Sequence, residues 1–422
     1  MIDASHPGWR RLRAIAGYTG RSLLPMALGL LTSLLVVRRD GAALWGSFVA
    51  VQLALQLAAH VVGWGNKDQV LRALARDGHA AAAAVLGNLR ARFLGLFGPV
   101  VLVVVAFAVA VGWSPTLTML GAAWIALRVL VQSFDALVLH ERRFVRAALS
   151  DTAGALVVVA GLLALPFVAL DVAPTVTLLL ALFCGAEALR LAALTIVFPE
   201  LWARPATESF TGSTTQTSSL VQSIPAVLRE GLPFFLLGAA GMLGSRVDLY
   251  CVTALLPTPE VARYQVLISA LLWLQSIAAL VLNPFARELY GMGHGALLRL
   301  TLAFAGFGAL IALPGVAGLW WLLVPGYGMA VDLPTMTVGY LYVVQMFVQV
   351  PAIYALYKAG RERGVLATSV AILVANFALN LALIPLLGAL GALVASAVVG
   401  WAAAVSYLWR AAALARTPVD GA

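Results

Sequence analysis

Long apolar segments follow one another along almost the whole chain, separated by short polar stretches. A helix that crosses a bilayer needs about 20 predominantly apolar residues, and twelve stretches have roughly this length. They cover residues 17–37, 45–65, 93–112, 116–138, 148–170, 174–198, 231–256, 262–283, 299–324, 335–357, 365–386 and 389–410. We therefore predict an all-α polytopic membrane protein with about 12 transmembrane helices.

The composition supports this prediction. Of the 422 residues, 62% are hydrophobic and only 11% are charged, whereas a soluble domain carries about 25% charged residues. Twelve spans leave short loops and no room for a large soluble domain. The two cysteines, Cys184 and Cys251, lie in apolar segments with no metal-ligand spacing and indicate buried thiols.

Positive charges are sorted between alternate connections. Three of the 27 Lys and Arg residues lie on one set of connections (Arg38, Arg39 and Arg263) and four lie inside apolar segments. The other twenty lie on the second set: Arg10, Arg11, Arg13, Lys67, Arg72, Arg76, Arg90, Arg92, Arg142, Arg143, Arg146, Arg204, Arg229, Arg287, Arg299, Lys358, Arg361, Arg363, Arg410 and Arg416. Loops rich in Lys and Arg stay cytoplasmic, which predicts that both termini are cytoplasmic and that the first span is uncleaved. The net charge of +9 follows loop parity, so we reject nucleic-acid binding and expect contact with anionic lipid.

One connection differs from the short loops. Residues 203–228 contain a polar, small-residue run and predict a flexible cytoplasmic linker. It divides the chain into six-helix bundles at 1–202 and 229–422. Faint similarity between the halves, such as Leu165-Pro166 and Ile384-Pro385 at the ends of the fifth spans, predicts two parallel repeats. Residues 78–92 are Ala-rich and predict a helix along the membrane surface.

Charged residues inside the spans are candidates for function, because a charge at mid-bilayer costs about 2.5–3.5 kcal/mol on insertion scales. Arg21, Arg128 and Arg246 are the candidate substrate-binding cations. Glu187 and Asp248 are candidates for ion coupling. The alternatives are structural: Glu187 is spaced to pair with Arg190, and Arg246 with Asp248.

Polar stripes on two spans are further candidates. Gln52, Gln56 and His60 are spaced four residues apart and share one helix face, as do Gln345 and Gln349. Such a stripe either lines a wet cavity or joins helices by hydrogen bonds. The glutamines are candidate substrate ligands, and His60, which titrates near neutral pH, is a third candidate for ion coupling. For Asn376 and Asn380 we expect helix packing.

The sequence contains no GxxxxGK[ST] loop, no HExxH and no paired CxxC. No long outward loop is predicted that would hold a catalytic site. We therefore expect no enzyme activity, no metal and no cofactor.

Several short motifs resemble bacterial polysaccharide-export proteins. They are Leu44-Trp45-Gly46-Ser47-Phe48, Gly231-Leu232-Pro233-Phe234-Phe235 with Arg246-Val247-Asp248, Ala262-Arg263-Tyr264, and the run from Asn376 to Ala392. In the last run, Asn376, Asn380, Ile384-Pro385, Gly388 and Gly391-Ala392 are similar to a pattern of the Wzx-type flippases, which belong to the multidrug/oligosaccharidyl-lipid/polysaccharide (MOP) exporter superfamily. Ala262 stands where the family usually has Gly.

This resemblance implies a MATE-like fold of two six-helix bundles around a cavity with alternating access. It also implies a bacterial inner-membrane location and an undecaprenyl-pyrophosphate-linked glycan as cargo, moved from the inner to the outer leaflet. Glycan polymerases and glycosyltransferases are the expected partners, and H⁺ or Na⁺ coupling remains open. The alternatives are a cation-coupled multidrug exporter, a lipid II flippase and, from another class, a membrane glycan polymerase or ligase.

Overall fold

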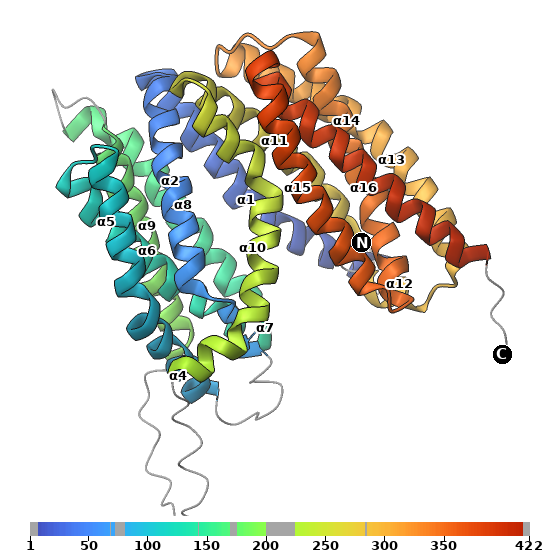
Figure 1. Cartoon of the computed structure of the whole chain (residues 1–422), viewed down its shortest axis with the longest axis horizontal. Coiled ribbons are helices and arrows are strands. Elements are labelled where there is room, and N and C mark those ends of the chain that lie inside the picture. Colours follow the sequence, from blue (N-terminus) through green and yellow to red (C-terminus); the bar gives the residue numbers. More distant parts are fainter. Residues whose placement is uncertain are drawn as a thin grey trace, which may run out of the picture. The chain divides into compact units, whose positions relative to one another are not determined.

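The computed structural model describes residues 7–67, 69–71, 81–141, 143–168, 175–199, 224–282 and 285–416. Within these ranges the regular structure is helical throughout, which confirms the predicted fold class (Figure 1). Each of the twelve predicted spans falls on a helix. Among the described residues, ten helices are long and apolar enough to cross a membrane, or eleven if the bent α10 counts as one span. The chain is therefore a multi-pass membrane protein.

The chain divides into two compact units. Unit 2 comprises Ser47–Gly241 and unit 1 comprises Met1–Gly46 with Met242–Ala422. Unit 2 holds most of α2 (Ala42–Gly63), α4 (Ala81–Arg92), η1 (Phe93–Phe97), α5 (Gly98–Ala110), α6 (Pro115–Ser133), α7 (Asp135–His140), α8 (Phe144–Val168), α9 (Val176–Val197) and the first part of α10 (Ile224–Leu255). The π-helical turn η1 joins α4 to α5 in one candidate span, Val85–Ala110. Residues 81–92 are helical as predicted, and their location along the membrane surface stays a prediction.

Unit 1 holds the helix that precedes unit 2 and those that follow it. They are α1 (Pro7–Asp40), the rest of α10, α11 (Thr258–Leu282), α12 (Ala286–Gly291), α13 (His294–Trp321), η5 (Leu322–Gly326), α14 (Leu333–Lys358), α15 (Glu362–Leu387) and α16 (Ala389–Arg416). Because α10 begins at Ile224, the last five residues of the predicted linker are helical, while 203–223 lie outside the described residues. The division into bundles at 1–202 and 229–422 stays a prediction.

Local sequence signals set several helix ends. Ser114, Thr175 and Asp332 are the N-caps of α6, α9 and α14, and each side-chain oxygen accepts a hydrogen bond from the backbone N–H three residues on. Gly388 ends α15 with φ +60°, a conformation that suits glycine. A Cβ at Gly391 would lie 2.3 Å from the Leu383 carbonyl oxygen. Part of the run that resembles the flippase pattern therefore serves a tight helical hairpin.

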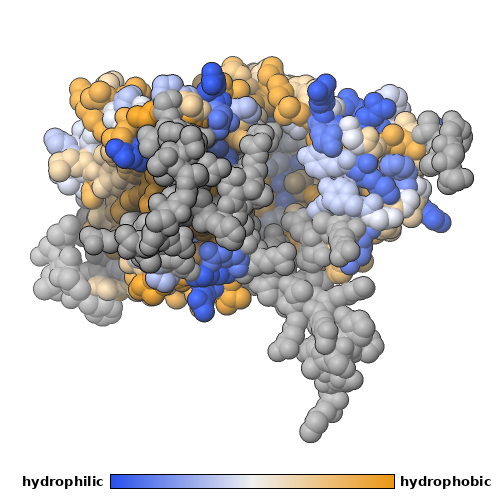
Figure 2. All heavy atoms as spheres, turned by 90° about the horizontal axis from the view of Figure 1, so that it is seen from below, coloured by the Kyte–Doolittle hydropathy of each residue, from blue (hydrophilic) through white to orange (hydrophobic). Residues whose placement is uncertain are grey.

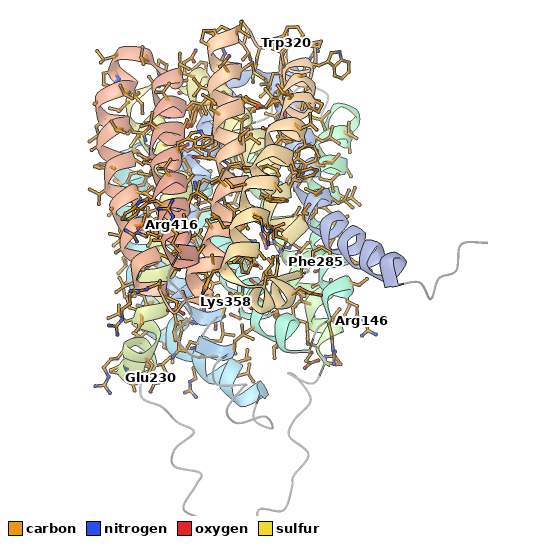
Figure 3. The ribbon with its side chains drawn as sticks, turned by 90° about the vertical axis from the view of Figure 1, so that its right-hand side faces the viewer. Arg146, Glu230, Phe285, Trp320, Lys358 and Arg416 are labelled. Carbon is orange, nitrogen blue, oxygen red and sulfur yellow. The ribbon has the colours of Figure 1, made fainter. Side chains whose placement is uncertain are left out.

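Apolar side chains fill both units. One buried cluster in unit 2 includes Val131, Phe134, Leu137 and Phe198, and one in unit 1 includes Ala352, Leu356, Val365 and Tyr407. Within unit 1, Trp320 lies at one end of the helices and Lys358 near the other (Figure 3). Polar groups buried among these apolar surfaces define the candidate sites.

Candidate functional site

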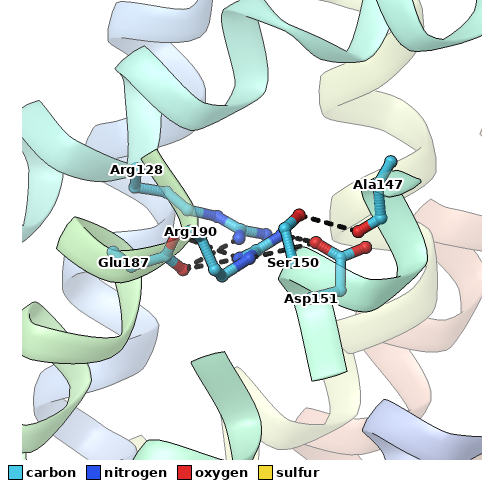
Figure 4. A network of polar contacts seen from close by, with 6 residues as sticks. All are labelled: Arg128, Ala147, Ser150, Asp151, Glu187 and Arg190. Atoms are coloured by element: carbon cyan, nitrogen blue, oxygen red, sulfur yellow. Dashed lines mark hydrogen bonds and ion pairs between the residues drawn. The ribbon is translucent and has the colours of Figure 1, made fainter. Parts of the chain in front are cut away.

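Four charged side chains form a network inside unit 2, where α6, α8 and α9 meet (Figure 4). Glu187 Oε1 accepts hydrogen bonds from Arg128 Nη1 at 3.0 Å and from Arg190 Nη1 at 2.9 Å. Asp151 Oδ1 accepts from Arg190 Nε at 3.0 Å and from Arg190 Nη2 at 2.5 Å. The Glu187–Arg190 pair that the i, i+3 spacing allows is present on α9. It is part of a larger network, because Arg128 and Asp151 reach it from two other helices.

The two arginines of this network differ in how they are compensated. Arg190 lies between two carboxylates and has 18% of its side chain exposed, whereas Arg128, within the described part of unit 2, forms a direct ion pair with Glu187 alone and is 32% exposed. Charged groups in a membrane span face the bundle interior or a water-filled cavity. Arg128 is therefore the arginine of this network whose guanidinium N–H groups are available to bind another anion.

Asp151 is a site residue that the sequence analysis missed, although it is an acidic residue inside a predicted span. Asp135 lies near enough to interact electrostatically with Arg128, Arg190 and Asp151, and also with Lys67. With Asp135 included, these groups carry three carboxylates and three cations. The network is therefore close to neutral.

A second polar cluster surrounds Asp248 in unit 1. The Asp248 side chain is buried, and its Oδ2 accepts a hydrogen bond from the Tyr264 hydroxyl at 2.5 Å. Its Oδ1 accepts from the Leu249 N–H at 2.8 Å, and Ser396 Oγ lies 3.4 Å from Oδ2. A carboxylate from α10 is thus held by donors from α10, α11 and α16.

Arg246 interacts electrostatically with Asp248 but does not form a salt bridge with it among the described residues. Its side chain is half-buried. Because the hydroxyls and the backbone N–H supply the direct contacts to Asp248, the Arg246 guanidinium retains donors for another ligand.

The glutamine pair of α14 lies against α16. Gln349 Nε2 donates to the Gly400 carbonyl oxygen at 2.9 Å. Gln345 is buried, and a Cβ at Gly400 would lie 1.6 Å from its Oε1. Gly400 therefore makes room for Gln345, whose buried Oε1 has no hydrogen-bond partner among the described residues, and Gln349 joins the two helices.

The stripe on α2 is arranged differently. Gln56 is exposed, and Gln52 and His60 are half-buried. Within the described part of the chain, neither glutamine forms a side-chain hydrogen bond, so neither joins helices in this way. The His60 ring lies 5.5 Å from the Phe235 ring of α10. Arg21 lies on α1, but its side chain is outside the described residues.

Arg92 is a further polar residue, which the sequence analysis counted among the charges that set the topology and did not expect to be buried. It is 0% exposed, and no carboxylate pairs with it in the described part of unit 2. Its Nε donates to Asn88 Oδ1 at 2.7 Å, Nη2 to Ser133 Oγ at 2.9 Å and Nη1 to the Gly63 carbonyl at 3.3 Å. Arg92 therefore ties the ends of α2, α4 and α6 together. Its burial could not be predicted because neighbouring arginines between two apolar segments indicate charges that stay outside the bilayer.

No group of three or more His, Cys, Asp or Glu side chains that could hold a metal ion is found among the residues the structure describes. The helices, with these two buried polar clusters, define the class: a polytopic helical membrane protein with charged groups inside its spans. The sequence matches no protein-family profile and no curated protein.

Solved structures identify the fold more closely. The chain is similar to lipid II flippase MurJ in an inward closed conformation, with a TM-score of 0.64, 13% identity and coverage of 94% of this chain and 87% of that one. It is also similar to a MATE-family multidrug resistance transporter of the MOP superfamily in an inward-facing conformation (TM-score 0.63, 15% identity, 94% and 99% coverage). A MATE structure in complex with MaL6 has a TM-score of 0.60 at 15% identity, with 96% and 98% coverage. The protein therefore has the MATE- and MurJ-like fold.

Proposed function

We propose that this protein is a transporter that flips an undecaprenyl-pyrophosphate-linked oligosaccharide from the inner to the outer leaflet of the bacterial cytoplasmic membrane. The observation that carries the proposal is the partly exposed Arg128 inside a membrane span, which forms its direct ion pair with Glu187 where α6, α8 and α9 meet. A diphosphate head group needs cations in a cavity, and the planar guanidinium suits phosphate oxygens.

In the proposed binding step, a phosphate oxygen replaces Glu187 at Arg128. Arg190 stays compensated, because Asp151 accepts two of its N–H groups. Arg21 and Arg246 are the other proposed cations. Gln52 and Gln56, which are free of helix-joining hydrogen bonds among the described residues, are proposed to bind sugar hydroxyls. Gln345 and Gln349 contribute less, because they already contact Gly400.

The proposed cycle is alternating access coupled to an ion. Asp248 is the strongest coupling candidate, because its buried carboxylate is held by Tyr264 and Ser396. Binding of a proton or Na⁺ would neutralise a charge that is costly to bury, so the free energy of this region depends strongly on whether the ion is bound. Glu187 and His60 remain candidates. The proposal is supported by the likeness to proteins described as a lipid II flippase and as multidrug transporters, and transport rather than catalysis fits the absence of catalytic motifs. Both termini are proposed to be cytoplasmic, with a glycan polymerase and glycosyltransferases as partners.

Depletion of the protein, followed by analysis of lipid-linked glycans with leaflet assignment, tests this function. The expected result is accumulation of undecaprenyl-linked repeat units on the cytoplasmic leaflet, reversed by the intact chain and not by Arg128→Gln. Unchanged surface glycan with altered drug resistance would instead establish a multidrug exporter.

Two other outcomes separate the remaining alternatives. Accumulated lipid II with arrested peptidoglycan synthesis would establish a lipid II flippase. Unpolymerised or unattached repeat units on the outer leaflet would establish a glycan polymerase or ligase. Each of these outcomes contradicts the proposed substrate step.

A further inference from the structure

A second basic feature lies in unit 1, at the end of the helices where Lys358 is found (Figure 3). There α14 ends, α15 begins and α16 ends around a pocket of about 760 Å³. Hydrophilic residues gather over this end of unit 1, at the right of Figure 2. The pocket is built from three helices of one compact unit.

Three arginines and one glutamate give this pocket its charge. Arg361, Arg363, Arg410 and Glu362 all line it, so the formal charge of its walls is about +2. Within the described residues, none of the three arginines forms an ion pair. Nearby Lys358 is engaged elsewhere, since its ammonium donates to the Met292 carbonyl oxygen.

One arginine is held in position by the backbone. Arg410 Nη1 donates to the Gly364 carbonyl oxygen at 3.0 Å, reaching from α16 to α15. A Cβ at position 364 would lie 3.2 Å from that nitrogen, so glycine leaves room for the guanidinium. The other N–H groups of Arg410 remain available to a ligand.

Apolar side chains form the rest of the wall. Trp409 lines the pocket and is 70% exposed, and Leu356 and Leu414 also line it. A tryptophan at the end of a membrane-spanning helix lies at the level of the lipid head groups. A free phosphate ion would contact only the arginines and not the apolar wall. A phospholipid would contact both, because its phosphodiester binds the arginines and its acyl chains pack against the apolar side chains.

From this geometry we propose that the pocket between α14, α15 and α16 binds the head group of an anionic phospholipid. Arg361, Arg363 and Arg410 contact the phosphodiester, and the first acyl segments lie against Trp409. Basic pockets between transmembrane helices are typical sites for such lipids. The site is independent of the proposed transport substrate. Three arginines that the sequence analysis used only to predict the membrane orientation thereby have a proposed role in binding.

Native mass spectrometry of the purified full chain with added phosphatidylglycerol tests the proposal. The intact protein should retain bound lipid, and the variant Arg361→Gln/Arg363→Gln/Arg410→Gln should retain about tenfold less, a change that corresponds to about 1.4 kcal/mol. The matched control, Arg146→Gln/Arg229→Gln/Arg299→Gln, removes the same charge from exposed positions elsewhere and should bind as the intact protein does. Phosphatidylcholine should bind weakly to all three.

The intact chain also allows a test without substitutions. A photoactivatable phosphatidylglycerol, reactive near its glycerol backbone, should label residues 356–364 and 409–414 in preference to other helix ends. Equal loss of lipid in both triple variants, no loss in either, or labelling spread over all loops would overturn the proposal. Displacement of the lipid by millimolar inorganic phosphate would also overturn it, because the pocket would then be a simple anion site.

Discussion

The hydroxyl of Tyr264 on α11 donates a hydrogen bond of 2.5 Å to Asp248 on α10, which joins two of the short motifs that resemble flippase sequences. If Asp248 is the coupling group, Asp248→Asn should keep the fold and reduce transport by about 10- to 100-fold, because Asn carries no charge for the coupling ion and a contact to a charged group contributes about 1.5–3 kcal/mol. Tyr264→Phe should reduce transport less, because Leu249 N–H and Ser396 remain. Transport in proteoliposomes is the measurement.

The control for this prediction is Ser245→Ala, which removes an exposed hydroxyl bonded within its own helix. It should transport at the level of the intact protein. Normal ion-dependent transport by a well-folded Asp248→Asn protein would remove Asp248 from the coupling step.

Glu187 should compete with an anionic ligand for Arg128. In Glu187→Gln the Arg128 guanidinium loses its carboxylate while Arg190 keeps Asp151, so we expect pyrophosphate to bind about tenfold more tightly. That change corresponds to about 1.4 kcal/mol. Isothermal titration with undecaprenyl pyrophosphate in detergent measures it.

Asp151→Asn is the matched variant, because it removes one carboxylate from the same network and leaves Glu187 on Arg128. It should change pyrophosphate affinity much less than Glu187→Gln does. Equal tightening in both variants would mean that net charge, rather than release of Arg128, governs binding.

Arg92 should stabilise unit 2. Arg92→Met leaves Asn88, Ser133 and the Gly63 carbonyl without their buried donor, and each unsatisfied group costs about 1–3 kcal/mol. We expect a loss of several kcal/mol, seen as a lower unfolding temperature in detergent. Arg90→Met, at an exposed position two residues earlier, should have little effect, and similar melting of both variants would refute the role of the buried guanidinium.

Gly400→Ala should destabilise the packing of α14 on α16 by about 1–3 kcal/mol, because its Cβ would overlap Gln345. Gln345→Ala should relieve the clash in the double variant. Gly318→Ala, where nothing lies within 4 Å of the added Cβ, should be neutral or slightly stabilising. A double-mutant cycle of unfolding free energies with no coupling between positions 400 and 345 would contradict this packing.

Tyr327, in the connection between η5 and α14, should make stability fall at high pH. Burial raises its pKa to about 12, and its hydroxyl donates to the Leu30 carbonyl oxygen at 2.6 Å. Since an unfolded tyrosine has a pKa of about 10, the neutral hydroxyl favours the folded state below pH 10. This contribution is lost as pH rises from about 10 to 12. Unfolding free energies between pH 8 and 11 should fall more for the intact protein than for Tyr327→Phe, and parallel curves would argue against a buried hydroxyl.

Much of the fold could be predicted, because a helix needs about 20 apolar residues to cross the bilayer. Each span is therefore visible in the sequence as a long apolar segment. The site was harder to predict. Spacing within one helix indicates the Glu187–Arg190 pair, but no spacing reveals that Arg128 and Asp151 reach them from other helices. The same holds for Tyr264 and Ser396 around Asp248. The burial of Arg92 was missed because residue type does not distinguish it from the exposed Arg90 on the same helix.

Leaflet-resolved flipping in proteoliposomes tests the central claim most directly. Vesicles carry the purified protein and a fluorescent undecaprenyl-pyrophosphate oligosaccharide, and a membrane-impermeant quencher reports the exposed fraction over time. The account predicts rapid exchange with the intact chain, slow exchange with Arg128→Gln and no exchange in protein-free vesicles. Exchange by the intact chain no faster than in protein-free vesicles, under an imposed H⁺ or Na⁺ gradient, would contradict it.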